Sequence, residues 1–482
     1  MEPTIFDKPL KIDRRPLWLI VLDRTIHYQV FAGLLLLCAI LFNLTPPEGL
    51  SLQGYHAMIL FAATVFLWVS GLLPLAVTSL VAMAMIPLLG IMDAKKTYAM
   101  FGNEAVFFIL GAFILAAAMT GSGLSARLAR SMLATFGRTP RRLALTVYLL
   151  CAFLSFVMSE HAVAAMMFPI VAEIGQSLQL TGERGRYGKL LFMSIAWGCV
   201  IGGIATFLGG ARAPLAVGML RETTGLGFSF YEWTMAAIPI VIPLLVIGFL
   251  VLLFFFPHDI ESVEDGLKFL NRKRLEAGRM SYGEMIVAIV MVLTILAWVF
   301  LGKALGLATI AIIATAVLFA CRVVSWQAIE EYVNWGVILM YGGAISIASA
   351  LEKTGAAQWL AGKGLASLSD SPFMVITIIS LISLLLTECI SNAAVIAILL
   401  PIGISIAGTM GMDPRVMTLA ITLPAGLAYC LPMGTPANAI VYSSGFLKGR
   451  EMITAGLIIM AISWLLFLGS ARFIWPLLGL DW

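Results

Sequence analysis

The sequence predicts an all-α membrane protein with about eleven transmembrane helices and two re-entrant helical hairpins, arranged as an inverted-topology repeat. The first observation is composition: 61% of the 482 residues are hydrophobic and only 12% are charged, whereas soluble domains carry about 25% charged residues. The second is that apolar runs recur, and many exceed the ~20 residues that span a hydrocarbon core. The third is that polar residues interrupt two of these runs, at Ser159 and Ser391.

Composition also excludes several classes of function. A net charge of +4 gives no nucleic-acid footprint. The six cysteines all lie in apolar segments without metal-ligand spacing, which indicates packing. Histidine is scarce, at four residues, and no nucleophile–base constellation stands out. We therefore expect a membrane protein that is not an enzyme.

The first quarter of the chain is predicted to hold simple spans. Residues 1–27 form a basic tail, typical of a cytoplasmic N-terminus before an uncleaved span. Spans are expected at residues 28–44, 55–71, 72–92 and 104–120. Residues 121–142 are rich in arginine and mark the cytoplasmic side. Four crossings from a cytoplasmic N-terminus return the chain to the cytoplasm, so the number of crossings agrees with the position of this arginine-rich segment.

The apolar run 143–175 is too long for one comfortable span and too short for two. Its middle is interrupted by Ser159, Glu160 and His161. Two half-length helices that meet at a polar tip explain this pattern. The sequence therefore predicts a re-entrant hairpin that enters and leaves on the cytoplasmic side.

The rest of the chain follows the same logic. A glycine-broken span is expected at 189–220, and residues 257–281 are the most polar segment, predicted as a cytoplasmic arm. A second interrupted run, 372–408, predicts the second hairpin. The remaining spans are expected at residues 235–256, 282–302, 304–320, 335–350, 414–445 and 452–476. Five crossings separate the hairpins, so the second enters from the opposite side. Eleven crossings leave the C-terminus outside, with the inner or plasma membrane of the cell as the default location.

An internal repeat relates the two interrupted runs. With a constant offset of 232 residues, residues 159–170 align with 391–402 and six of twelve positions are identical. One turn earlier, Ser155 aligns with Thr387. Together with the odd number of crossings, this predicts an inverted-topology repeat. Broken helices at membrane depth are tolerated where they line a cavity, and their ends coordinate ions and anions in transporters. The sequence thus predicts a transporter whose site lies between the two repeats.

At these residues the chain resembles the divalent anion/sodium symporter family, whose signature is Ser-Asn-Thr at each hairpin tip and a Gly-Thr-Pro loop ending in Asn. The second half keeps both elements well, in residues 387–392 and 434–438. The first half departs from them, in Ser159-Glu160-His161 and in residues 209–213. The resemblance implies transport of a dicarboxylate, tricarboxylate or sulfate, an elevator-type homodimer, and one sodium site per hairpin.

The resemblance also implies a division of each protomer and a set of site residues. Scaffold helices would occupy 28–142 and 282–371, and the transport domain would occupy 143–256 and 372–482. Carried over by position, the sodium ligands would be Ser155, Ser159, Glu160 and Gly209 in the first half and Thr387, Ser391, Asn392 and Gly434 in the second. The expected substrate-binding residues are Ser159, Glu160, His161, Arg212, Ser391, Asn392, Thr435, Pro436 and Asn438.

Glu160 replaces a neutral amide of the family pattern, and Arg212 lies where family members have no charge. A carboxylate at helix-centre depth costs roughly 2.5–3.5 kcal/mol, so it needs a partner or a task. Glu160 could bind the cation, carry a proton in place of one sodium, or pair with Arg212. The paired and protonated versions are favoured, because a bare carboxylate would repel an anionic substrate. His161 either relays protons or is an ordinary hydrogen-bonded histidine. The rival function is a cation/proton antiporter that uses Glu160.

Overall fold

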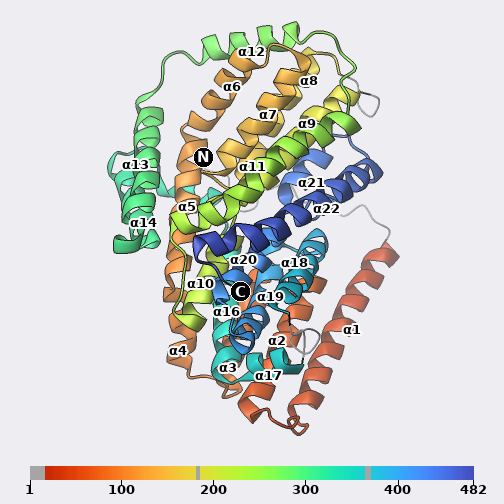
Figure 1. The fold of residues 1–482 in the computed structure, drawn as a ribbon, viewed down its shortest axis with the longest axis vertical. Helices are drawn as coiled ribbons and strands as arrows, with labels where there is room; N and C mark the ends of the chain where they lie inside the picture. Colours follow the sequence, from red (N-terminus) through yellow and green to blue (C-terminus); the bar gives the residue numbers. More distant parts are fainter. Residues whose placement is uncertain (1–16, 181–184, 364–370, 482) are drawn as a thin grey trace.

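The computed structural model describes residues 17–180, 185–363 and 371–481, and all regular structure in these ranges is helical (Figure 1). Within them, eight helical segments are long and apolar enough to cross a membrane. The predicted N-terminal tail lies outside the described residues up to residue 16, and its remainder belongs to the first helix, α1 (Leu17–Phe42). The all-helical prediction is therefore confirmed.

Helices occupy the regions of the first predicted spans, and local caps explain their ends. The helices are α2 (Leu52–Ser70), α3 (Leu75–Leu88), α4 (Ala94–Ala99) and α5 (Glu104–Gly121). Ser51 begins α2 by accepting a hydrogen bond from the Gly54 backbone N–H at 3.0 Å. Gly71 ends it with a left-handed φ of 65°, a conformation that glycine adopts without steric cost.

Both interrupted runs are pairs of helices. The first comprises α7 (Pro140–Ser155) and α8 (Glu160–Ser177), and the second α18 (Pro372–Cys389) and α19 (Asn392–Met410). Figure 1 shows the first pair in the upper part of the molecule and the second in the lower part. The breaks therefore lie at the polar positions that the sequence indicated.

The spans that follow each hairpin are broken as well. After the first hairpin come α9 (Arg186–Gly203), an irregular stretch, and α10 (Arg212–Thr224). After the second come α20 (Pro414–Ala425), an irregular stretch, and α21 (Pro436–Tyr442). The contacts are exchanged between halves: α10 packs against α19 and α20, and α21 packs against α8 and α9. Each half thus completes the surroundings of the other half's hairpin.

Glycine permits an extensive helix contact in the first half, between α7 and α9. A Cβ added to Gly202 would lie 2.6 Å from the Cα of Ala152, closer than packed atoms approach each other. Gly202 therefore lets the two helices approach each other and fixes the first hairpin against the broken span.

Amphipathic and peripheral helices complete the fold. Two stretches predicted only as polar segments contain helices, α6 (Leu124–Phe136) and α12 (Glu264–Glu276). The latter packs against α6 and α8, at the top of Figure 1. Arg127 secures this arm, because its side chain bonds Glu284 at 2.6 Å and the backbone oxygen of Gly278 at 2.8 Å. The other helices are α11 (Phe230–Phe255), α13 (Tyr282–Leu305), α14 (Leu307–Ala320), α15 (Trp326–Tyr332), α16 (Trp335–Lys353), α17 (Ala356–Lys363) and α22 (Gly449–Phe473).

Candidate functional site

The two hairpin tips have nearly the same local geometry. Ser159 caps α8 with φ −62° and ψ 139°, and Ser391 caps α19 with φ −63° and ψ 142°. Each hydroxyl accepts a backbone N–H three residues later, from Ala162 at 3.4 Å and from Ala394 at 3.3 Å. A serine that caps a helix satisfies one of the N–H groups left free at its first turn. The shared geometry supports the alignment of the two interrupted runs.

At the first tip, Glu160 and Arg212 form a buried ion pair. Arg212 Nη1 lies 3.1 Å from Glu160 Oε1, and the two side chains are only 3% and 1% exposed. The Glu160 backbone N–H donates to the carbonyl of Gly209 at 2.9 Å, which ties the tip to the irregular stretch before α10. The pairing expected from the two sequence departures is therefore present. A buried charge pair of this kind compensates each partner for lost hydration.

Three glycines make room for this pair. A Cβ on Gly203 would lie 2.5 Å from Glu160 Oε2, and a Cβ on Gly210 would lie 2.6 Å from Arg212 Nη1. A Cβ on Gly426, from the second half, would lie 2.9 Å from Arg212 Cζ. The guanidinium thus lies in a cradle of backbone from both halves. We call Gly203, Gly210 and Gly426 the glycine cradle.

At the second tip, oxygen atoms gather around one end of the Asn392 amide. That end lies 2.8 Å from Thr387 Oγ1 and 3.3 Å from the carbonyl oxygens of Ala425 and Gly434. Thr387 Oγ1 in turn donates to the Ala425 oxygen at 2.6 Å. When the amide oxygen faces this side, it lies 2.8–3.3 Å from three other oxygen atoms. Neutral and backbone oxygens are the ligands that hard cations prefer, so these residues fit a sodium ion.

The other end of the same amide reaches the first half. It lies 3.3 Å from Arg212 Nη1. With its nitrogen toward the oxygen cluster and its oxygen toward Arg212, the amide makes a hydrogen bond at every contact. Amide orientations are assigned from such networks. Arg212 therefore contacts Glu160 at one tip and Asn392 at the other.

Glu388 and Asn438 hold the irregular stretch between α20 and α21. The Glu388 carboxylate accepts the backbone N–H groups of Tyr429, Cys430 and Leu431 at 2.7–3.1 Å. The Asn438 side-chain amide donates to the carbonyls of Ala428 and Leu431, both at 3.2 Å. Glu388 therefore fixes the backbone of this stretch, and the same backbone engages the Asn438 amide nitrogen.

The remaining predicted residues separate into buried and accessible ones. Thr435 is 1% exposed and caps α21 through the Asn438 backbone N–H, whereas Pro436 beside it is exposed. Ser391 is also exposed. The buried Ser155 hydroxyl has no hydrogen-bond partner among the described residues, which leaves its oxygen free for a ligand.

A cavity of about 690 Å³ opens beside the first tip. Ser159, His161 and Gly210 at the tip line it, and so does Arg130 on α6. The His161 side chain is accessible within it. Of the described residues at the second tip, Ser391 and Asn392 do not line this cavity. The volume is ample for a small organic anion.

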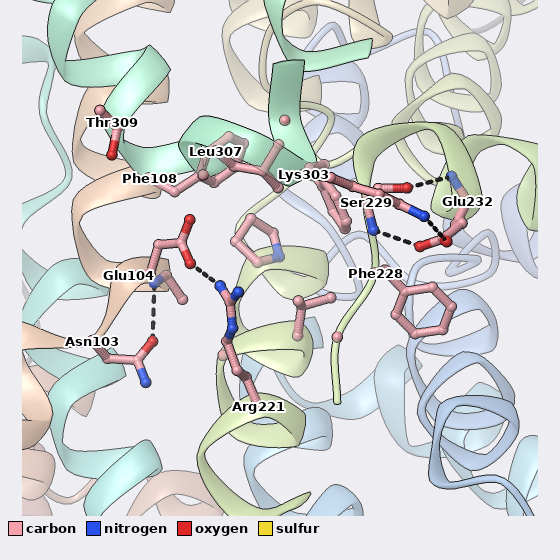
Figure 2. Close-up of a pocket in the computed structure, with 18 of the residues that line it drawn as sticks. Asn103, Glu104, Phe108, Arg221, Phe228, Ser229, Glu232, Lys303, Leu307 and Thr309 are labelled. Atoms are coloured by element: carbon pink, nitrogen blue, oxygen red, sulfur yellow. Dashed lines mark hydrogen bonds and ion pairs between the residues drawn. The ribbon is translucent and has the colours of Figure 1, made fainter. Parts of the chain in front are cut away.

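A second pocket, of about 630 Å³, lies between α5, α10, α11 and α13 (Figure 2). Two ion pairs cross it: Arg221 with Glu104, and Lys303 with Glu232 at 2.7 Å. Figure 2 shows both pairs. Sequence reasoning missed them, because their partners lie far apart in the chain and only the fold brings them together.

Comparison with known proteins decides the family. The model of the sodium:sulfate symporter transmembrane region matches residues 25–480. The chain belongs to this family. It is therefore a sodium-coupled anion transporter rather than an enzyme.

Relatives of this sodium:sulfate symporter family member are similar over nearly their whole length. A protein of Staphylococcus aureus named sodium-dependent dicarboxylate transporter SdcS is 30% identical, over 94% of this chain and 92% of that protein. Its namesake from Staphylococcus saprophyticus is 29% identical over 93% of this chain and 92% of that protein.

Two solved transporters share the fold at low sequence identity. The YdaH transporter of Alcanivorax borkumensis has a TM-score of 0.55 at 16% identity and covers 88% of this chain and 99% of its own. MtrF of Neisseria gonorrhoeae, one of a class of antimetabolite efflux pumps, has a TM-score of 0.57 at 14% identity and covers 91% and 96%. These likenesses concern the fold alone.

Sequence reasoning missed some members of the site. The carbonyl of Ala425 and the glycine Gly426 meet the predicted residues only because α20 ends beside the tips. The sequence signal for Gly426 is its place in Pro424–Leu427, where a span with a proline and a glycine breaks. Arg130 belongs to the arginine-rich segment 121–142, and its position at the cavity was not predicted.

Proposed function

We propose that this transporter carries a small dicarboxylate-class anion in symport with sodium, by alternating access. The centre of this motion would be the place where Arg212 connects the two hairpin tips, which we call the joint. The observation that carries the proposal is the oxygen cluster of Thr387, Asn392, Ala425 and Gly434 beside the buried Arg212. A cation there and a fixed cation nearby would together attract an anion. The names of the Staphylococcus relatives support a dicarboxylate over sulfate.

The proposed division of labour follows the positions of the residues. The second-half oxygen cluster would hold sodium, and the accessible tip residues, with His161 in the cavity, would contact the anion. The negative charge of the substrate would be balanced by sodium, Arg212 and the positive ends of α8 and α19. Arg130 would offer a further cation on the cavity wall.

The wider architecture is part of the proposal. The exchanged packing of α10 and α21 supports an inverted repeat. We propose that residues 143–256 and 372–482 move as one body against a scaffold of 28–142 and 282–371, in an elevator-type homodimer. The N-terminus would be cytoplasmic and the C-terminus outside, because the arginine-rich segment 121–142 and the arm 257–281 then face the cytoplasm.

The antiporter alternative is less well supported. A Glu160 that carries protons must be neutral in part of each cycle, and that would leave the Arg212 guanidinium buried without its carboxylate. An uncompensated buried charge costs several kcal/mol. The ion pair therefore favours a positioning role for Glu160 over proton exchange.

The test is charge movement in proteoliposomes on a solid support. Succinate, citrate and sulfate would be applied under separate sodium and pH gradients. We expect a current that needs both succinate and sodium, and a Thr387→Val variant that needs roughly tenfold more sodium because it loses one oxygen ligand. A current with sulfate but not succinate would reassign the substrate. Cation flux without any anion would support the antiporter instead.

A further inference from the structure

One arginine joins two positions that the internal repeat makes equivalent. Glu160 and Asn392 are related by the same 232-residue offset that aligns the hairpin tips. Arg212 Nη1 lies 3.1 Å from Glu160 Oε1 and 3.3 Å from the Asn392 amide. The second half gathers three oxygen atoms around the Asn392 amide at this position, and the first half supplies a carboxylate paired with Arg212. The two halves therefore differ in the group at equivalent positions: the first half has a carboxylate paired with a fixed arginine, and the second has neutral oxygen atoms.

The arginine position is built into the fold. The side chain is 3% exposed, and the glycine cradle leaves it space from both halves. Within the described residues, Arg212 Nη2 and Glu160 Oε2 have no hydrogen-bond partner. The guanidinium is thus held through Nη1 and keeps unused donor capacity at Nη2.

The Asn392 amide can satisfy only one of its neighbours with its single carbonyl oxygen. When this oxygen accepts from Arg212, the amide nitrogen fills the oxygen cluster and donates to it. A sodium ion in the cluster needs the oxygen instead, because an amide nitrogen is a donor and cannot coordinate a cation. The nitrogen would then face the guanidinium, donor against donor. The two arrangements exclude each other.

We propose that Arg212 is a tethered cation that competes with sodium for the Asn392 amide oxygen. The proposal rests on the sodium site of the proposed function and adds the device that couples it to the first half. Sodium entry turns the amide and releases Arg212 Nη1 from Asn392. The released donor stays paired with Glu160 and becomes available to an anion at the joint. In the first half the cation beside Glu160 is Arg212, whereas the second half would bind sodium at the equivalent position, Asn392.

The test measures sodium binding without transport. Purified protein would be titrated with sodium chloride without an anionic substrate, and the midpoint of thermal unfolding would be recorded. Choline chloride would hold the ionic strength constant. The key variant is Glu160→Gln/Arg212→Met, which removes the pair without changing net charge. We expect its half-saturating sodium concentration to fall about tenfold, the size of a competing hydrogen bond to a charged group.

Two further variants keep the test decisive. Lys189→Met/Glu451→Gln removes another ion pair, of 2.6 Å between α9 and α22. It should leave the half-saturating sodium concentration unchanged. Arg212→Lys keeps a cation beside Glu160 and is expected to fold even if the double variant does not. The lysine ammonium bonds the tips less well than a planar guanidinium, so the half-saturating sodium concentration of this variant should fall about threefold.

The outcomes are distinct. A lower half-saturating sodium concentration in the Arg212 variants, with an unchanged value in the control, supports competition. If the folded Arg212 variants have an unchanged or higher half-saturating sodium concentration while the parent binds sodium, the competition is overturned and the sodium site stands. A parent protein without any sodium-dependent shift refutes the proposed sodium site, and the competition with it.

Discussion

At the residue scale, the pair of Glu160 and Arg212 carries the largest energetic consequence. Both side chains are buried, so loss of one partner leaves a charge without water or counter-ion. Removing one partner of a buried pair costs about 3–5 kcal/mol, whereas removing both costs much less. The two substitutions are therefore expected to compensate each other.

We predict that Glu160→Gln and Arg212→Met each lower the thermal unfolding temperature strongly. The double variant should recover most of the loss, and a double-mutant cycle on the detergent-purified protein measures the coupling. A coupling of ~2 kcal/mol or more is expected for groups in direct contact. If the two losses simply add, the side chains do not stabilise each other and the pair has no structural role.

Sequence alone reached part of this residue-scale picture. Two departures from the family pattern, a carboxylate and an arginine, are chemically complementary, so their pairing could be predicted from Glu160 and Arg212. The contact of Arg212 with Asn392 could not be predicted. It depends on how α10 packs against α19, and no local pattern in the chain records that distance.

At the element scale, the broken span between α20 and α21 depends on one carboxylate. Glu388 at the end of α18 accepts the backbone N–H groups of Tyr429, Cys430 and Leu431. Without an acceptor these buried donors would lose their partners, at ~1–3 kcal/mol each. The carboxylate thus fixes the backbone that leads to Gly434 and the oxygen cluster.

We predict that Glu388→Gln destabilises the protein by ~2–3 kcal/mol, because a neutral amide offers one acceptor oxygen where the carboxylate offers two. Thermal unfolding would report the stability, and hydrogen exchange would show faster exchange at residues 429–431. The exposed neighbour variant Cys389→Ser is the control and should change neither. Protected amides at 429–431 in the Glu388 variant would contradict the role.

The elements that the sequence predicted well are those with a strong local signal. Ser159 and Ser391 interrupt apolar runs and cap helices, so their breaks could be placed from sequence. The polar stretch 121–142 was predicted only as a cytoplasmic marker, and it contains the helix α6. A short helix that buries one face against neighbours has too few apolar residues to stand out from a loop in composition.

At the scale of the whole molecule, ion pairs follow the proposed division into two bodies. Arg221 with Glu104, Lys303 with Glu232, and Lys353 with Glu222 each join a proposed scaffold residue to a proposed transport residue. All three involve the end of α10 or the start of α11. A sliding motion of one body would separate them together. The pairs should therefore hold the conformation in which the cavity at His161 is open.

We predict that neutralising these three pairs makes that conformation less populated. Partly exposed pairs contribute ~0.2–1 kcal/mol each, so the population ratio should change roughly tenfold when all three are removed. The measurement is the labelling rate of an Ala165→Cys variant, whose side chain lines the cavity, in a background without native cysteines. Slower labelling is expected, and the Lys189→Met/Glu451→Gln variant serves as control because both residues lie in one proposed body. Unchanged labelling in a protein that still transports would mean that the three pairs do not select a state, and that the boundary between the moving bodies runs elsewhere.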